Sequence, residues 1–150
     1  MQHLLDSNHL ASNVSFVRLL EGYRASGGMA PRDVVARLLE EDRLGDFVSL
    51  EKLLGNQQVF AVEWCHSMWI PMFQFHSREL SIKLAVQVVR AELPRDALGW
   101  SVGTWFAWPN HELDGQRPAD LIDSQLVAVI ETARRYSLSS LVHYGQFSNQ

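Results

Sequence analysis

Apolar residues recur at helical spacing through most of the chain. The spacing predicts helices over residues 14–24, 32–41, 49–54, 77–93, 97–108 and 125–136, with a short helical turn at 119–122. Gly27-Gly28 and Pro94 are among the breaks that mark helix ends. Residues 77–93 show the clearest amphipathic pattern. Its polar stripe would be Glu79, Lys83, Gln87 and Arg90, and its inward stripe Leu80, Leu84, Val88 and Ala91.

The middle of the chain has an extended pattern instead. Residues 59–64 alternate and residues 68–75 form a second extended run, so the short link Cys65–Ser67 predicts a β-hairpin. Pro71 cannot donate a backbone hydrogen bond, which favours an edge or a bulge. Two strands alone are marginally stable, so the aromatic face of the hairpin is expected to cover the helices of residues 78–136. The predicted fold class is mainly α with one β-hairpin (α+β), a helical bundle of about six to seven helices.

Three regions follow from these elements. Residues 1–57 form an N-terminal helical region that is degenerate helix-turn-helix-like, residues 58–136 hold the hairpin and the main helices, and residues 137–150 form a polar C-terminal tail. A recognition helix presents basic or amide side chains to base edges. The third short helix offers only Lys52, which is the candidate DNA-binding residue, and an ordinary packing helix is the alternative interpretation.

Composition narrows the class of protein. A chain with 47% hydrophobic and 20% charged residues is typical of a globular fold. The net charge of -4 counts against a nucleic-acid-binding function, because phosphate binding needs a basic surface. A lone cysteine and the absence of a signal-peptide pattern at the start predict a cytoplasmic protein. No apolar run is long enough for a membrane span.

Residues with catalytic potential do not form a recognisable pattern. Cys65 and His66 are neighbours, and adjacent side chains on a strand or turn point in different directions, so they do not make a nucleophile–base pair. The histidines lack metal-ligand spacing, and the glycines follow neither phosphate-loop nor dinucleotide-binding spacing. We therefore expect no enzyme, no metal and no cofactor.

The segment 105–122 has a pattern of turns and helix ends. A helix is expected to end at Trp108-Pro109, with Asn110 bonding its own backbone in the following turn and Gly115 allowing a positive φ. Pro118 suits the first position of a new helix, and Asp120 lies favourably in that helix's first turn.

The order of these residues resembles the signature of the Xre/MbcA/ParS antitoxin family, in its C-terminal toxin-binding domain. The matching positions are Trp105, Pro109, Asn110, Leu113, Gly115, Arg117, Pro118, Asp120 and Leu121. The chain departs from the family pattern at Asp114, where a small residue is common, and in the spacing of Trp105 from Pro109. The hairpin is similar to one that precedes this domain in some antitoxin-like proteins, so the resemblance covers residues 58–136. Trp105, Leu113 and Leu121 are nevertheless expected in the core.

The resemblance implies a non-catalytic protein that binds and neutralises a partner toxin, commonly a RES-type NAD-degrading enzyme. It also implies an N-terminal part that dimerises and binds the operator of its own promoter. In the family the inhibitory contact comes largely from the C-terminal segment, here about residues 134–150. Aromatic and arginine side chains dominate interface hot spots. The candidate partner-binding residues are therefore Arg134, Arg135, Tyr136, Tyr144 and Phe147, and a tail that docks on its own domain is the alternative.

Two other functions remain open from the sequence. One is a DNA-binding transcriptional regulator without a toxin, and the other is an orphan dimerisation or scaffold module. The expected partners are thus a protein toxin and, secondarily, operator DNA, with no membrane. A homodimer is also expected, because few charges interrupt residues 68–75 and an exposed apolar strand edge invites pairing.

Overall fold

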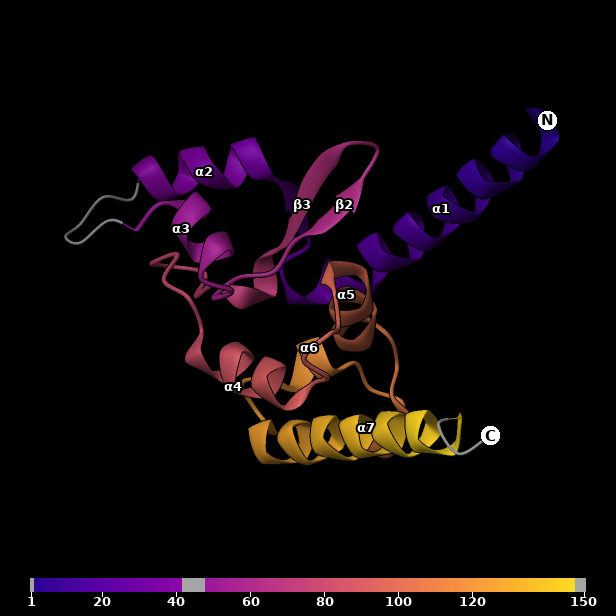
Figure 1. The fold of residues 1–150 in the computed structure, drawn as a ribbon. Helices are drawn as coiled ribbons and strands as arrows, with labels where there is room; N and C mark the ends of the chain where they lie inside the picture. Colours follow the sequence, from indigo (N-terminus) through magenta and orange to yellow (C-terminus); the bar gives the residue numbers. More distant parts are fainter. Residues whose placement is uncertain (1, 42–47, 148–150) are drawn as a thin grey trace.

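The computed structural model describes the protein over residues 2–41 and 48–147, with side chains over residues 13–41 and 48–141. Its fold is mainly helical with a small antiparallel sheet, which confirms the predicted α+β class (Figure 1). The α-helices are α1 (Gln2–Tyr23), α2 (Arg32–Glu41), α3 (Leu50–Gly55), α4 (Leu84–Glu92), α5 (Gly99–Ala107), α6 (Pro118–Leu121) and α7 (Leu126–Phe147). Short 3-10 helices are η1 (Arg24–Ser26), η2 (Met72–Gln74) and η3 (His111–Leu113).

The sheet contains one more strand than the sequence predicts. Strands β2 (Val62–Trp64) and β3 (Ser67–Pro71) form the expected hairpin, and positive φ angles of 49° at Cys65 and 61° at His66 make its two-residue turn. Strand β1 (Met29–Pro31) pairs with the other side of β3, so the order is β1-β3-β2. Pro31 ends β1 and directly precedes Arg32, the first residue of α2.

Strand β3 is therefore central, which corrects two predictions. Pro71 lies at the end of the central strand opposite Met29, not at an edge or a bulge. The apolar edge that suggested a homodimer through residues 68–75 does not exist, because β1 and β2 cover β3 on both sides. On β2, the carbonyl oxygen of Glu63 accepts a hydrogen bond of 2.6 Å from the indole of Trp100 in α5. A long uncharged run is typical of a strand buried between two neighbouring strands as well as of an edge strand that pairs with another chain.

The predicted helix over residues 77–93 is wrong in its first half. The chain over 76–83 instead folds back on the end of the sheet: His76 N donates to Ser81 O at 2.8 Å, and Lys83 N donates to Gln74 O at 2.8 Å. Leu80 adopts a positive φ of 50°, which no helix tolerates. Tertiary pairing of the backbone thus overrides the helical spacing.

The buried face of α4 also differs from the prediction. Val86 and Val89 face the core, whereas Leu84 and Val88, expected inward, are exposed. At the other end of the chain, the predicted helix end at Tyr136 is wrong, because α7 continues to Phe147. Helix α1 likewise begins at Gln2, well before the expected start at Val14, and Figure 1 shows its first half projecting away from the body of the molecule.

Two hydrophobic clusters lie against the sheet. The larger joins α1, α4, α5, α6 and α7 around Phe106, and the smaller joins α2, α3 and the sheet around Val35 and Phe75. Phe60 and Phe73 reach Phe106 with ring centroids 5.7 and 5.0 Å apart. The expectation that the aromatic face of the hairpin covers the helices of residues 78–136 is confirmed for Phe60 and Phe73. The strand residues Trp64 and Trp69 instead lie against Phe16 of α1, with ring centroids 4.2 and 5.2 Å away.

A glutamine amide completes the sheet end. Gln74 is buried, and its Oε1 accepts from Phe60 N at 2.9 Å while its Nε2 donates to Phe60 O at 2.9 Å and to Pro71 O at 3.0 Å. The side-chain amide has the same donor and acceptor as a peptide group, so it extends the backbone pairing where no strand is available. It connects the segment before β2 to the segment after β3.

Helix α1 is joined to α5 at its C-terminal end. Gly22 allows this approach, because a Cβ atom there would lie 2.6 Å from the carbonyl oxygen of Ala107. The next residue, Tyr23, is buried. Its hydroxyl donates to the carbonyl oxygen of Gly103, which lies one helical turn before Ala107, at 2.5 Å. Burial raises the pKa of Tyr23 well above its ordinary value of 10.0.

This pKa shift predicts a loss of stability in alkali. The unfolded chain releases the Tyr23 proton near pH 10 and the folded chain holds it, so the free energy of unfolding should fall above about pH 10 by up to about 1.4 kcal/mol per pH unit. Tyr23→Phe should remove this part of the slope and lower stability by about 1 kcal/mol at neutral pH. Urea denaturation of both proteins from pH 8 to 11 measures it, and equal alkaline slopes would contradict the prediction.

Candidate protein-binding site

The segment that carries the antitoxin resemblance folds as a closed turn between α5 and α6. Asn110 Oδ1 accepts from Glu112 N at 3.0 Å, Asn110 N donates to Gln116 O at 3.0 Å, and Gly115 N donates to Asn110 O at 2.9 Å. Gly115 has the expected positive φ of 79°, and Asp114 shares that backbone region with a φ of 57°. Asn110 therefore organises the turn, as its sequence context predicts.

Helix α6 begins as predicted, with Pro118 at its first position and Asp120 in its first turn. Leu113 and Leu121 are buried, which confirms their placement in the core, whereas Trp105 is only half-buried. Pro109 is exposed at the end of α5, and Arg117 is half-buried at the N-cap position of α6. The motif residues thus shape and anchor the turn. Leu113, Pro118 and Leu121 are buried, Trp105, Asn110 and Arg117 are half-buried, and Pro109, Gly115 and Asp120 are exposed.

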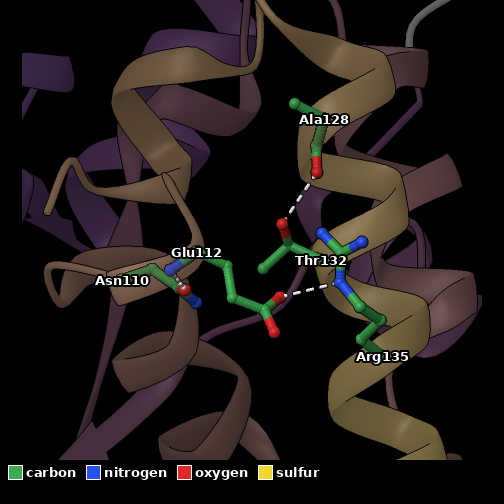
Figure 2. Close-up of polar contacts among 5 residues, drawn as sticks. All are labelled: Asn110, Glu112, Ala128, Thr132 and Arg135. Atoms are coloured by element: carbon green, nitrogen blue, oxygen red, sulfur yellow. Dashed lines mark hydrogen bonds and ion pairs between the residues drawn. The ribbon is translucent and has the colours of Figure 1, made fainter. Parts of the chain in front are cut away.

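An ion pair holds this turn against α7. Arg135 Nε lies 3.0 Å from Glu112 Oε2, and the neighbouring Thr132 is buried with its hydroxyl donating to Ala128 O at 2.8 Å (Figure 2). Both side chains of the ion pair are about half exposed, so it contributes at most about 1 kcal/mol. Its structural effect is to fix which side of α7 faces the turn.

Three of the five candidate partner-binding residues have described side chains: Arg134, Arg135 and Tyr136. Arg134 and Arg135 are exposed but already engaged, Arg134 Nη2 with Glu92 Oε1 of α4 at 3.1 Å and Arg135 with Glu112. The hydrogen bond with Glu92 raises the pKa of Arg134. Tyr136 is 46% exposed, and its ring centroid lies 6.5 Å from that of Trp105. The side chains of Tyr144 and Phe147 lie outside the described residues.

Trp105, Glu112, Arg135 and Tyr136 together make one surface, here named the Tyr136 surface. It combines the end of α5, the turn and α7, three segments that are separate in the sequence. Tyr136 and the Arg135–Glu112 pair are exposed on this surface, and Trp105 is half-buried beside them. Aromatic and arginine side chains are enriched at protein interfaces.

Lys52, the candidate DNA-binding residue, is exposed on α3, a helix of six residues. Its amide N donates to the Ser49 side chain at 3.3 Å, which caps the helix. The adjacent Glu51 forms an ion pair with Arg32 of α2 at 3.4 Å. One cation beside a carboxylate on so short a helix gives little attraction for phosphate.

Groups able to do acid–base chemistry are spread over the surface. Cys65 and His66 occupy the two turn positions of the hairpin and are exposed. An open hollow of about 390 Å³ is lined by His76, Ser77, Arg78, Glu79 and Ser81, all exposed. Within residues 2–41 and 48–147, no group of three or more His, Cys, Asp or Glu side chains is placed to hold a metal ion. No helix in the same ranges is long and apolar enough to cross a bilayer.

Comparisons of the chain with models of protein families, with characterised proteins and with solved structures found no match. The antitoxin resemblance therefore rests on the motif residues between Trp105 and Leu121 and on the hairpin.

Helices α4 and α7 expose large apolar residues that the sequence analysis did not predict. Leu84 and Val127 are 70% and 68% exposed, and Leu138 is 62% exposed, although all three are large and apolar. The spacing of Val127, Glu131, Arg134 and Leu138 places them on one side of α7, opposite the buried Val129 and Ala133. This spacing is visible in the sequence, but the continuation of the helix beyond Tyr136 is needed to recognise it.

Proposed function

We propose that the protein is a non-catalytic, antitoxin-like protein that binds and neutralises a partner toxin through the Tyr136 surface. The observation that carries the proposal is the half-exposed Tyr136 ring, packed against Trp105 beside the turn that resembles the antitoxin motif. Aromatic rings held on a rigid helix bind a partner with a small loss of conformational entropy. In this proposal α7 presents Tyr136 while the Arg135–Glu112 pair fixes the helix against the turn.

A RES-type NAD-degrading enzyme is the toxin class that the resemblance implies, and the cytoplasm is the compartment that a lone exposed thiol favours. The net charge of -4 and the single cation on α3 do not favour operator DNA, so DNA binding is not part of the proposal. The proposal needs no cofactor and no metal.

The proposal predicts that Tyr136→Ala abolishes neutralisation. Removing a hot-spot aromatic side chain costs about 2 kcal/mol or more of binding free energy, so the dissociation constant for the toxin should rise at least about 30-fold. The measurement is NAD consumption by a purified RES-type NAD-degrading enzyme, titrated with the full chain, together with calorimetric binding. Ser139→Ala, also exposed on α7, is the matched control and should inhibit like the unmodified protein.

Both variants should remain folded, because Ser139 is exposed and Tyr136 is 46% exposed. Loss of the contact with Trp105 should lower the thermal unfolding temperature of Tyr136→Ala only slightly. Equal inhibition by Tyr136→Ala and the unmodified chain would reject the Tyr136 surface. If the toxin bound neither protein, and the chain instead bound duplex DNA with a steep salt dependence, the regulator function would replace this proposal.

A further inference from the structure

Helices α4 and α7 lie side by side (Figure 1). Both helices expose large apolar side chains. They run parallel, because Lys83 pairs with Asp123 at 2.8 Å near their starts and Glu92 pairs with Arg134 at 3.1 Å further along. The outer α4–α7 face consists of the exposed residues opposite the core: Leu84, Val88 and Ala91 on α4, and Val127, Glu131, Arg134, Leu138 and Leu141 on α7.

Four residues of α7 on this face have an order that is complementary to its own reverse: apolar residues stand at both ends, and an acid and a base stand between them. Along the helix they are apolar Val127, acidic Glu131, basic Arg134 and apolar Leu138. If a second copy of α7 lies antiparallel across a two-fold axis between residues 132 and 133, Val127 meets Leu138 of the second copy and Glu131 meets Arg134 of the second copy. Each contact occurs twice, as an isologous interface requires.

We propose that the protein forms a two-fold symmetric homodimer through the outer α4–α7 face, with the two α7 helices antiparallel. Charge complementarity selects a second copy as the occupant, because the acid–base order along α7 matches itself only in this orientation. The Arg134 guanidinium has five N–H donors, so it can keep Glu92 of its own chain while binding Glu131 of the second copy.

Helix α4 enlarges the apolar part of the interface. Leu84 lies near the start of α7, since the adjacent Lys83 binds Asp123. The two-fold axis therefore brings Leu84 toward the region of Leu138 and Leu141 of the second copy. Burying these exposed side chains removes apolar surface from water, which is the main driving force for association.

The dimer is independent of the proposed toxin binding. Tyr136 lies on the opposite side of α7 from Val127 and Leu138 by helical spacing, so a dimer leaves the Tyr136 surface open. Loss of dimerisation with toxin inhibition retained, or the reverse, would therefore separate the two proposals.

The first test is the oligomeric state of the full chain by sedimentation equilibrium. The unmodified protein should be a dimer, and Leu138→Glu should raise its dissociation constant at least about a hundredfold, because each change is counted twice across a two-fold axis. Circular dichroism should show an unchanged fold, since Leu138 is exposed. A monomeric unmodified chain at tens of micromolar would overturn the proposal.

A charge-reversal experiment tests the antiparallel register. Glu131→Arg alone and Arg134→Glu alone each place like charges opposite one another in a homodimer, so each variant should dissociate. Mixing the two variants restores opposite charges at both junctions, and the mixture should form a heterodimer with nearly the original dissociation constant. Arg37→Glu on α2 is the matched control, because Arg37 is exposed on a helix away from α4 and α7 in Figure 1. It should not change dimerisation.

Failure of the mixture to associate would reject the antiparallel arrangement. A further outcome would be protection of the outer face from hydrogen exchange only when a toxin is bound. That result would mean that the toxin, and not a second copy of the chain, binds the outer α4–α7 face, and it would overturn the homodimer proposal.

Discussion

Replacing Phe106 by alanine should lower the free energy of unfolding by about 3–5 kcal/mol. The Phe106 ring is fully buried and lies where the sheet end and the helices meet, with centroids of Phe60, Phe73 and Trp105 5.7, 5.0 and 5.1 Å away. The substitution removes buried apolar surface and leaves a cavity that these rigid rings cannot close. Since domain stabilities are commonly 5–15 kcal/mol, the loss is a large share of the total.

Urea denaturation followed by tryptophan fluorescence measures this loss. Leu98→Ala is the matched control, because Leu98 is the N-cap residue of α5 and is 78% exposed. This substitution should change the free energy of unfolding by at most about 0.5 kcal/mol. A loss below about 1.5 kcal/mol for Phe106→Ala would mean that the aromatic cluster is loosely packed, contrary to the structure.

Replacing Gln74 by leucine should cost about 3–4 kcal/mol, although leucine is similar in size and more apolar. The Gln74 amide makes three buried hydrogen bonds, and its loss leaves Phe60 N–H, Phe60 C=O and Pro71 C=O without partners. Each unpaired buried group costs about 1–3 kcal/mol, which exceeds the gain from burying a leucine side chain. The measurement is again urea denaturation.

Gln116→Leu provides the control for Gln74, because the Gln116 side chain is exposed in the motif turn. Its stability should stay within about 0.5 kcal/mol of the unmodified protein. A small effect at Gln74 together with a preserved hairpin would show that water or a backbone shift satisfies the freed groups.

Local chemistry made the motif turn predictable from the sequence. Asn110, Gly115 and Pro118 each act through contacts with residues a few positions away, so their side-chain types determine the turn before any tertiary contact forms. The hairpin was predictable for the same reason: strand alternation and a two-residue link are local features.

Elements that depend on distant partners were not predictable. Strand β1 forms because its residues pair with β3, which lies far along the chain, and the short sequence Met29–Pro31 carries no strand pattern of its own. Residues 77–83 have helical spacing, but hydrogen bonds from His76 and Lys83 hold them in a turn. Helix α7 passes through a serine-rich segment that suggested a polar tail.

The candidate site was partly predictable. Tyr136 and the two arginines were identified from residue type alone, and the structure places them on the exposed sides of α7. Their intramolecular partners, Glu92 and Glu112, come from other elements and could not be recognised from spacing. The outer α4–α7 face was missed because Leu84 and Val88 were expected inward.

The tight hairpin turn gives the protein a built-in site for chemical labelling. Cys65 is the chain's only cysteine and is exposed at the tip between β2 and β3, which Figure 1 shows on the opposite side of the molecule from α4 and α7. A maleimide dye or a nitroxide attached there would leave both proposed binding surfaces untouched. A pair of such labels would report the distance between two copies directly, without any engineered cysteine.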